Sequence, residues 1–146
     1  TVNHVYTAGN GGSAANASHL ALHLNDAGLS ATCLTDSPSL LTARANDYGY
    51  EAALAKMLPS ASSNAAIITC SVSGESANIR RLCELGLRNG WPVYGLFGQA
   101  RDSKATAFRD GLTGVIEIRD RAFGPVEDAH SVVLHILGVL LKTRMS

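Results

Sequence analysis

The sequence predicts a single domain of the α/β class, in which a doubly wound parallel sheet of about five strands lies between two layers of helices. Short apolar runs rich in β-branched residues alternate along the whole chain with stretches that have helical spacing. Turns rich in glycine or serine follow the first and third apolar runs. In folds of this class, ligands bind at the carboxyl ends of the strands, where those turns lie.

The expected strands are short and apolar, and each is bounded by Gly, Ser, Asp or Pro. They are residues 2–8, 31–34, 65–70, 93–97 and 114–118. The expected helices lie between and after them, at residues 13–25, 40–45, 51–58, 76–89 and about 126–142. Residues 98–112 have the weakest pattern, and we expect a short helix or a loop there.

Composition excludes several classes of protein. The chain has 146 residues, 46% of them hydrophobic, and buries roughly two-thirds of its unfolded surface, so it does not need disulfides or a metal in order to fold. Its 12 basic residues balance 12 acidic ones, which argues against nucleic acid as a direct partner. No apolar run approaches the roughly 20 residues of a membrane span and no leader sequence opens the chain, so we expect a cytoplasmic protein that does not bind membranes.

The three cysteines, Cys33, Cys70 and Cys83, do not form a C-x-x-C pair. We expect them to be reduced thiols that pack in the interior.

A glycine-rich turn follows the first expected strand and leads directly into the first expected helix. It reads Gly9-Asn10-Gly11-Gly12-Ser13-Ala14. Glycines allow such a turn to bring its N–H groups close to an anion at the positive end of the helix. The turn also matches G-x-G-x-x-A, a weak form of the dinucleotide motif, so a nicotinamide-binding domain with Asp36 as the supporting acid is one alternative. A tight turn without a ligand is another.

A turn rich in hydroxyl groups follows the third expected strand. It reads Ser71-Val72-Ser73-Gly74-Glu75-Ser76 and precedes a helix. Hydroxyl groups, backbone N–H groups and the helix dipole can together bind one phosphate. The alternative is that the turn binds no ligand, with Ser76 as the N-cap of the helix and the other serines as ordinary turn residues. Because the turn has no basic residue, a nucleotide hydrolase of the P-loop type is not expected.

Four of the five histidines fall in two places. His19 and His23 are four residues apart on the first expected helix, so their rings share one face and can reach one metal ion. Glu127, His130 and His135 lie on the last helix. Glu127 and His135 are about 12 Å apart along its axis, so both can bind one metal only if Glu127 leans in from the start of the helix. His130 points to another face and is expected to pack, and His4 is given no role.

Four stretches of the chain are typical of one family when taken together. They are residues 9–15 with His19, residues 41–50 with the sequence Asn46-Asp47-Tyr48-Gly49-Tyr50, residues 71–76, and residues 127–130 with His135. Over nearly its whole length the chain resembles sugar isomerase (SIS) domains, specifically the phosphoheptose isomerases. The resemblance implies the strand order 2-1-3-4-5 and an N-terminal helical segment that this chain lacks. It also implies an enzyme that interconverts an aldose and a ketose phosphate through an enediol, and a homotetramer with sites at subunit interfaces.

The resemblance assigns roles to individual residues. It implies that the sugar phosphate is bound by Asn10, Gly11, Ser13, Asp47, Ser71, Val72, Ser73 and Ser76. It implies zinc at the positions of His19, His23, Glu127 and His135. In the family, the glutamate at the position of His23 is the catalytic base, and the histidine at the position of His135 is an acid or base.

Three departures from the family pattern bear on the chemistry. His23 replaces the catalytic glutamate, and Glu127 replaces a glutamine. We therefore expect Glu127 to be the base, while His19, His23 and His135 hold zinc or polarise the substrate. Gly124 occupies a position where the resemblance implies an acidic sugar contact, so we expect a substrate that differs from sedoheptulose 7-phosphate, of the heptose 7-phosphate or octose 8-phosphate type.

The leading alternative is a noncatalytic SIS module that binds a phosphosugar or a partner protein. Loss of the glutamate at position 23 favours this alternative, whereas retention of His19, Glu127 and His135 opposes it. The nicotinamide-binding alternative leaves the serine-rich turn and the histidines unexplained.

Overall fold

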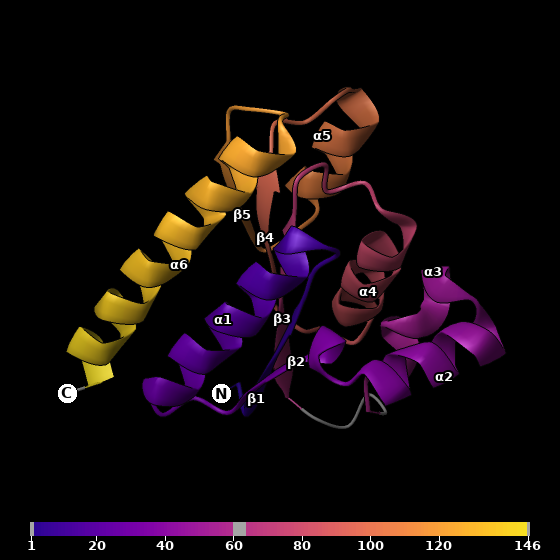
Figure 1. Cartoon of the computed structure of the whole chain (residues 1–146), viewed down its shortest axis with the longest axis horizontal. Coiled ribbons are helices and arrows are strands. Elements are labelled where there is room, and N and C mark those ends of the chain that lie inside the picture. The colour runs from indigo at the N-terminus through magenta and orange to yellow at the C-terminus, as the bar shows by residue number, and fades with distance from the viewer. Residues whose placement is uncertain (1, 60–63, 146) are drawn as a thin grey trace.

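The structure is a computed structural model that describes residues 2–59 and 64–145. A five-stranded parallel sheet lies between two layers of helices (Figure 1). Its strands are β1 (His4–Ala8), β2 (Ala31–Cys33), β3 (Ala65–Ser71), β4 (Val93–Gly98) and β5 (Gly114–Ile118). They are arranged in the order β2-β1-β3-β4-β5. This arrangement confirms both the predicted fold class and the predicted strand order.

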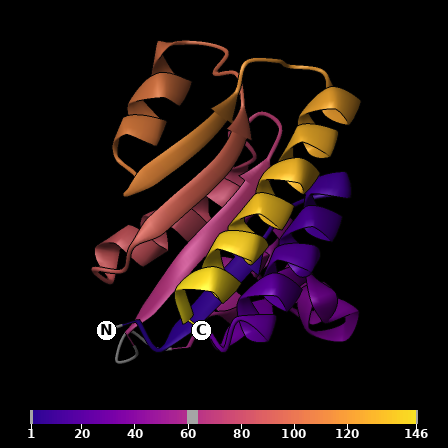
Figure 2. The same ribbon diagram turned by 90° about the vertical axis from the view of Figure 1, so that its left-hand side faces the viewer.

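The helices divide between the two faces of the sheet. One face carries α1 (Gly12–Asp26) and α6 (Phe123–Met145), which pack side by side (Figure 2). The other face carries α2 (Pro38–Tyr48), α3 (Tyr50–Ala53), α4 (Ala77–Arg88) and α5 (Ser103–Asp110), with 3₁₀ turns η1 (Leu34–Asp36) and η2 (Ala55–Met57). Strand order explains this division. The connection from β1 to β2 runs toward one edge of the sheet, and the connections from β2 to β3, β4 and β5 run toward the other edge. Because crossovers are right-handed, the helices of the two directions lie on opposite faces.

Two segments differ from the sequence prediction in detail. The weakly patterned segment 98–112 contains the helix α5, which starts where the Asp102 carboxylate accepts a hydrogen bond of 2.9 Å from the Ala105 N–H. The predicted helix 51–58 is divided into α3 and η2. The division falls at Leu54, which is fully buried in the core, so the chain bends to bury this side chain.

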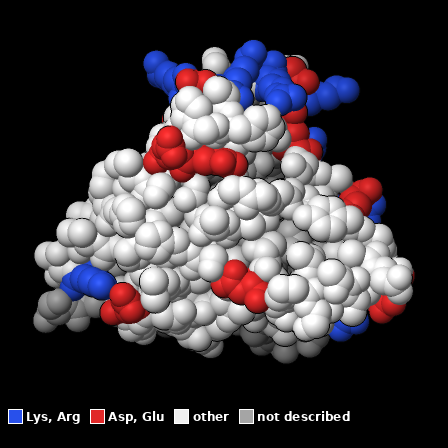
Figure 3. Space-filling model, viewed as in Figure 1, with Lys and Arg blue, Asp and Glu red and all other residues white. Residues whose placement is uncertain are grey.

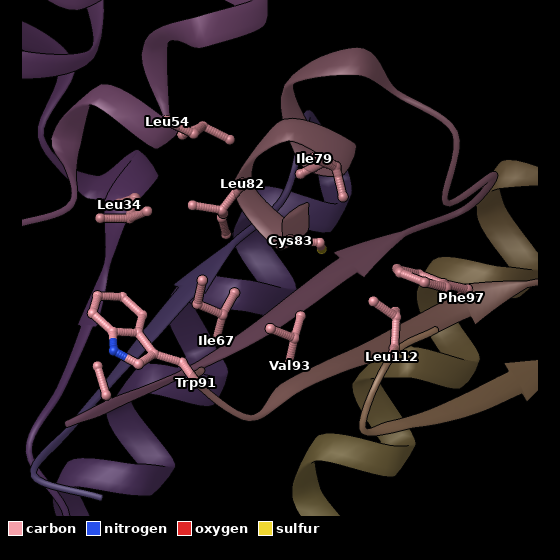
Figure 4. Close-up of a cluster of buried hydrophobic side chains, with 12 residues drawn as sticks. Leu34, Leu54, Ile67, Ile79, Leu82, Cys83, Trp91, Val93, Phe97 and Leu112 are labelled. Atoms are coloured by element: carbon pink, nitrogen blue, oxygen red, sulfur yellow. The ribbon is translucent and has the colours of Figure 1, made fainter. Parts of the chain in front are cut away.

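The core has one part on each face of the sheet. On the α4 face, Leu54, Ile67, Leu82, Val93 and Phe97 are fully buried in one cluster (Figure 4). On the α1 face, the second part is formed by Val5, Leu20, Leu24, Ala66 and Leu134. Each large side chain buried in this way contributes about 1.5–3 kcal/mol to folding.

The three cysteines are buried and unpaired, as predicted. Burial raises the pKa of Cys70 to about 12 and that of Cys83 to about 11. Their thiols are therefore protonated at neutral pH and serve as packing groups.

Helix α6 has an exposed apolar side. By length and composition, Phe123–Arg144 could cross a membrane, and 22% of its apolar window is buried in the domain. Leu134 packs toward α1, whereas Val132, Ile136, Val139 and Leu140 are all more than half exposed. We call these four residues the α6 outer face. Beside α6, an apolar hollow of about 430 Å³ is lined by Tyr94, Ile116, Leu137, Leu141 and their neighbours.

Charged side chains are unevenly distributed, although their sum is zero. Figure 3 shows Lys and Arg gathered at the end of the molecule near α5, while most of the same view is uncharged. Exposed cations in this region are Arg101, Lys104, Arg119 and Arg121, close to the ends of β4 and β5. Acidic side chains, among them Asp102, Glu117 and Asp120, lie in the same region, so charges of both signs gather at this end of the molecule.

His130 makes folding sensitive to pH. It is fully buried, as expected for a packing residue, and burial lowers its pKa below the ordinary value of 6.5. The unfolded chain therefore takes up a proton below about pH 6.5 that the folded chain does not, so the free energy of unfolding falls as pH falls.

We predict that His130→Phe, which removes this titration, reduces the loss of stability between about pH 7.5 and about pH 5.5. Urea unfolding at the two pH values measures the difference. An equal loss in the two proteins would contradict the prediction.

Candidate active site

A pocket lies where the strand order reverses, at the carboxyl ends of β1 and β3. Its volume is about 310 Å³, and we call it the switch-point pocket. Its lining residues come from the turn after β1, the loop after β3 and the start of α6: Asn10, Gly11, Gly12, Ser13, Ser71, Val72, Ser73, Ser76, Phe123 and Glu127. Ligands of doubly wound sheets bind at such a position.

The structure brings together two stretches that are far apart in the sequence. Of the eight residues expected to bind the sugar phosphate, seven line this pocket: Asn10, Gly11, Ser13, Ser71, Val72, Ser73 and Ser76. β1 and β3 are adjacent strands, with Ala8 opposite Thr69, so the segments that follow them emerge side by side.

The serine loop, residues 71–76, presents hydroxyl hydrogens to a ligand. The Gly74 N–H donates to Ser71 Oγ at 3.0 Å, and the Glu75 N–H donates to Ser73 Oγ at 3.1 Å. Each oxygen is thus occupied as an acceptor, which leaves its own hydrogen free to donate. Ser76 is the N-cap residue of α4, but its side chain makes no cap hydrogen bond. These hydroxyls and the positive end of α4 can bind an anion without a basic lining residue.

Asn10 is held in one orientation by two residues that the sequence analysis did not assign. Its Oδ1 accepts hydrogen bonds of 2.8 Å from the Asn78 amide and from the Tyr50 hydroxyl. Its Nδ2 donates to Asn78 Oδ1 at 3.0 Å. Asn78 is buried in the first turn of α4. Tyr50 belongs to the stretch 46–50, which is part of the family resemblance. That stretch was the sequence signal from which a role for Tyr50 near the site could have been predicted.

Glu127 lies at the start of α6 and faces the first turn of α1. Its carboxylate lies beside Gly12, where a Cβ would overlap Glu127 Oε2, so a side chain at position 12 would displace the carboxylate. Its carbonyl oxygen accepts a hydrogen bond of 2.9 Å from the Asn16 amide, which ties α1 to α6. Glu127 therefore places a carboxylate in the same pocket as the serine hydroxyls.

His19, His23 and His135 form a cluster between α1 and α6. Their rings are 4.6 Å (His19–His23), 4.9 Å (His19–His135) and 5.4 Å (His23–His135) apart between centroids. One ligand nitrogen from each ring lies within 4.8 Å of the others. Space for the His23 ring exists because position 138 is glycine, where a Cβ would lie 2.8 Å from His23 Nδ1.

The environment of His23 favours its neutral form. Burial is the largest cause that lowers its pKa, followed by the neighbouring His19 and His135 and by Lys142, and Asp26 opposes them in part. Its Nε2 is buried without a hydrogen-bond partner among the described residues. A neutral imidazole with a free ring nitrogen is the form that binds a metal ion.

The four residues expected to bind zinc lie in two places. The three histidines cluster, whereas Glu127 is outside the group of potential ligands found among residues 2–59 and 64–145. Eight residues of α6 separate Glu127 from His135, a distance of about 12 Å along the axis. Glu127 lies in the first turns of α6, but its side chain turns toward Gly12 and not toward the histidines.

Other residues singled out from the sequence lie outside the pocket. Asp47 is exposed on α2, and its carboxylate accepts a hydrogen bond of 3.3 Å from the neighbouring Asn46. Asp36 accepts a hydrogen bond of 2.8 Å from Ser18. His4 contacts the hydroxyls of Ser30 and Thr32. Phe123, which has no sequence motif of its own, lines the pocket with 66% of its surface exposed.

The strand order β2-β1-β3-β4-β5 is that of the SIS fold, and the named relatives of the chain make it a sugar phosphate isomerase, an intramolecular oxidoreductase. No family model matches the chain. It is 33% identical to the phosphoheptose isomerase of Aneurinibacillus thermoaerophilus over 147 residues, covering 96% of this chain and 72% of that protein. It is 31% identical to the phosphoheptose isomerase of Geobacter sulfurreducens over 144 residues, covering 94% of this chain and 74% of that protein. The chain belongs to the phosphoheptose isomerase family.

The solved structures agree with this assignment. The phosphoheptose isomerase of Neisseria gonorrhoeae superposes with a TM-score of 0.86 at 26% identity, over 97% of this chain and 77% of that one. Membership of this family excludes the nicotinamide-binding alternative.

Proposed function

We propose that this chain interconverts the aldose and ketose forms of a long-chain sugar phosphate, of the heptose 7-phosphate or octose 8-phosphate type, through an enediol. One observation carries the proposal: the Glu127 carboxylate and the three serines of the loop line the same pocket. A phosphate bound at the serines brings the sugar chain into the space that Glu127 faces.

Each group of pocket residues has a separate role in the proposed reaction. The hydroxyls of Ser71, Ser73 and Ser76 and the N-terminus of α4 bind the phosphate. Glu127 removes a proton from the carbon beside the carbonyl. The electrons of that C–H bond form a C=C bond, the carbonyl π electrons move onto its oxygen, and that oxygen takes up a proton to give the enediol. Glu127 then returns its proton to the former carbonyl carbon, while the hydroxyl on the neighbouring carbon loses its proton and becomes the new carbonyl. Asn10, oriented by Asn78 and Tyr50, presents an amide to the sugar oxygens.

We propose that His19, His23 and His135 hold a zinc ion. Three imidazole nitrogens within 4.8 Å of one another, one of them buried and unpartnered, fit the nitrogen ligands that zinc accepts. When bound, zinc supplies a Lewis acid that stabilises negative charge on oxygen. Without a metal, His23 and His135 are the groups of this cluster that can transfer protons.

We predict that Glu127→Gln lowers the isomerisation rate by about 10²- to 10⁴-fold, because the amide cannot accept the proton. The measurement is conversion of sedoheptulose 7-phosphate or an octulose 8-phosphate, with Asp128→Asn, the exposed neighbour on α6, as the matched control. Full activity of Glu127→Gln would refute the assignment of the base. Phosphate binding without turnover in the unmodified chain would favour the noncatalytic alternative.

We predict that Gly138→Ala weakens zinc binding by about tenfold or more, because the new methyl group displaces the His23 ring. Zinc content by mass spectrometry and competition with a chelator measure the effect. Gly124→Ala is the control, since a Cβ at position 124 has no atom within 4 Å among the described residues. If the two variants bind zinc equally, His23 is not a ligand.

We also propose that the α6 outer face is covered by a second copy of the chain, as the homotetramer of the resemblance implies. The four exposed apolar residues of this face and the adjacent apolar hollow support the proposal, because exposed apolar area of this kind marks interaction sites.

Charged substitutions at Ile136 and Val139 should therefore lower the molar mass in sedimentation equilibrium. Leu87→Glu on α4, on the opposite face of the sheet, should leave the mass unchanged. A monomeric unmodified chain would contradict the prediction.

A further inference from the structure

Arg109 is a buried cation next to the serine loop but outside the pocket lining. It lies in the last turn of α5, and its side chain is 6% exposed. Its Nη1 donates to the Gly98 carbonyl at 2.7 Å and to the Glu117 carboxylate, and its Nη2 donates to the Ser73 carbonyl at 2.8 Å. The guanidinium also lies 5.3 Å from the centre of the Phe97 ring. One side chain thus joins the ends of β4 and β5 to the serine loop.

This arrangement requires an arginine. Burying a charged group is costly unless its hydrogen bonds are satisfied. The planar guanidinium donates to two carbonyls and a carboxylate from two separate nitrogens, Nη1 and Nη2, whereas the three donors of a lysine share one nitrogen. Its Nε is buried without a hydrogen-bond partner among the described residues. Glu117 is 37% exposed, so water screens its charge more than it screens the charge of Arg109. The cationic end of the Arg109–Glu117 ion pair therefore contacts the loop, while the carboxylate lies nearer to solvent.

A chain of hydrogen bonds leads from Arg109 to the pocket. The Ser73 carbonyl, which accepts from Arg109, belongs to the same peptide group as the Gly74 N–H. That N–H donates to Ser71 Oγ at 3.0 Å, and Ser71 lines the pocket. Hydrogen bonds in series polarise one another, so donation to the carbonyl makes the N–H, and then the Ser71 hydroxyl, a better donor.

We propose that Arg109 is a positioning residue for phosphate recognition, which holds the serine loop in shape and transmits its positive charge to the Ser71 hydroxyl through the Ser73–Gly74 peptide. The inference rests on the proposed function, because it takes the serine loop to be the phosphate site. It explains how a pocket lined by neutral donors and one carboxylate binds an anion.

The test measures binding of inorganic phosphate by titration calorimetry to the unmodified chain, Ser71→Ala, Arg109→Lys and Arg121→Lys. We expect Arg109→Lys and Ser71→Ala each to raise the Kd by about tenfold, the worth of one charge-assisted hydrogen bond. Arg121→Lys is the matched control, because Arg121 donates to the Ala100 carbonyl at the same edge of the sheet and does not contact the loop. With a sugar phosphate substrate, Arg109→Lys should raise KM more than it lowers kcat.

Each outcome decides between the two proposals. An unmodified chain that does not bind phosphate overturns the proposed function, and this inference with it. If Ser71→Ala binds phosphate more weakly while folded Arg109→Lys keeps its Kd and KM, only the role of Arg109 is overturned. The same holds if Arg109→Lys loses thermal stability but binds phosphate as the unmodified chain does. If Arg109→Lys does not fold, Glu117→Ala removes the partner that orients the guanidinium. It should raise the phosphate Kd by about threefold, and an unchanged Kd would overturn the proposal.

Discussion

The packing of α1 against α6 determines where the chemistry of this protein lies. Both helices start at the switch-point pocket and run in the same direction across one face of the sheet. The contacts between them follow in order along both helices, from Asn16 with Glu127, through His23 with Gly138, to Asp26 with Lys142. Because the helices are rigid, this register places a carboxylate at the pocket and three imidazoles about two turns farther along.

The exchange of residue types between the two helices has a physical consequence. The family resemblance implies a glutamate four residues after the first histidine, whereas this chain carries His23 there and a carboxylate at Glu127 on the other helix. A carboxylate thus lies at the positive end of α1 and not in its middle. The histidine cluster offers nitrogen ligands alone, the set that we propose holds zinc.

Phosphate recognition in this fold depends on how neutral groups are arranged. The serine loop has no lysine or arginine, and the whole chain carries no net charge. Folding nevertheless gathers exposed cations near α5 and buries Arg109 against the loop (Figure 3). In the proposed function, the directed hydroxyls of the serine loop provide specificity for the phosphate, and Arg109 supports the loop from behind.

The sequence by itself determined the strands, most helices and the two ligand-binding turns, because each depends on a local pattern of apolar, glycine and serine residues. It also indicated His19 with His23, since i and i+4 residues share a helix face whatever the fold. The family resemblance, and not the pattern, supplied the strand order and the role of His135.

Only the tertiary structure decided which of these residues meet. It separated Glu127 from the histidines, left Asp47 outside the pocket, and brought Asn78, Tyr50 and Arg109 to the ligand-binding turns. The helix α5, which carries Arg109, has only a weak sequence pattern. The physical reason is that such contacts depend on strand order and helix register, which join residues up to 116 positions apart, as in the Asp26–Lys142 ion pair.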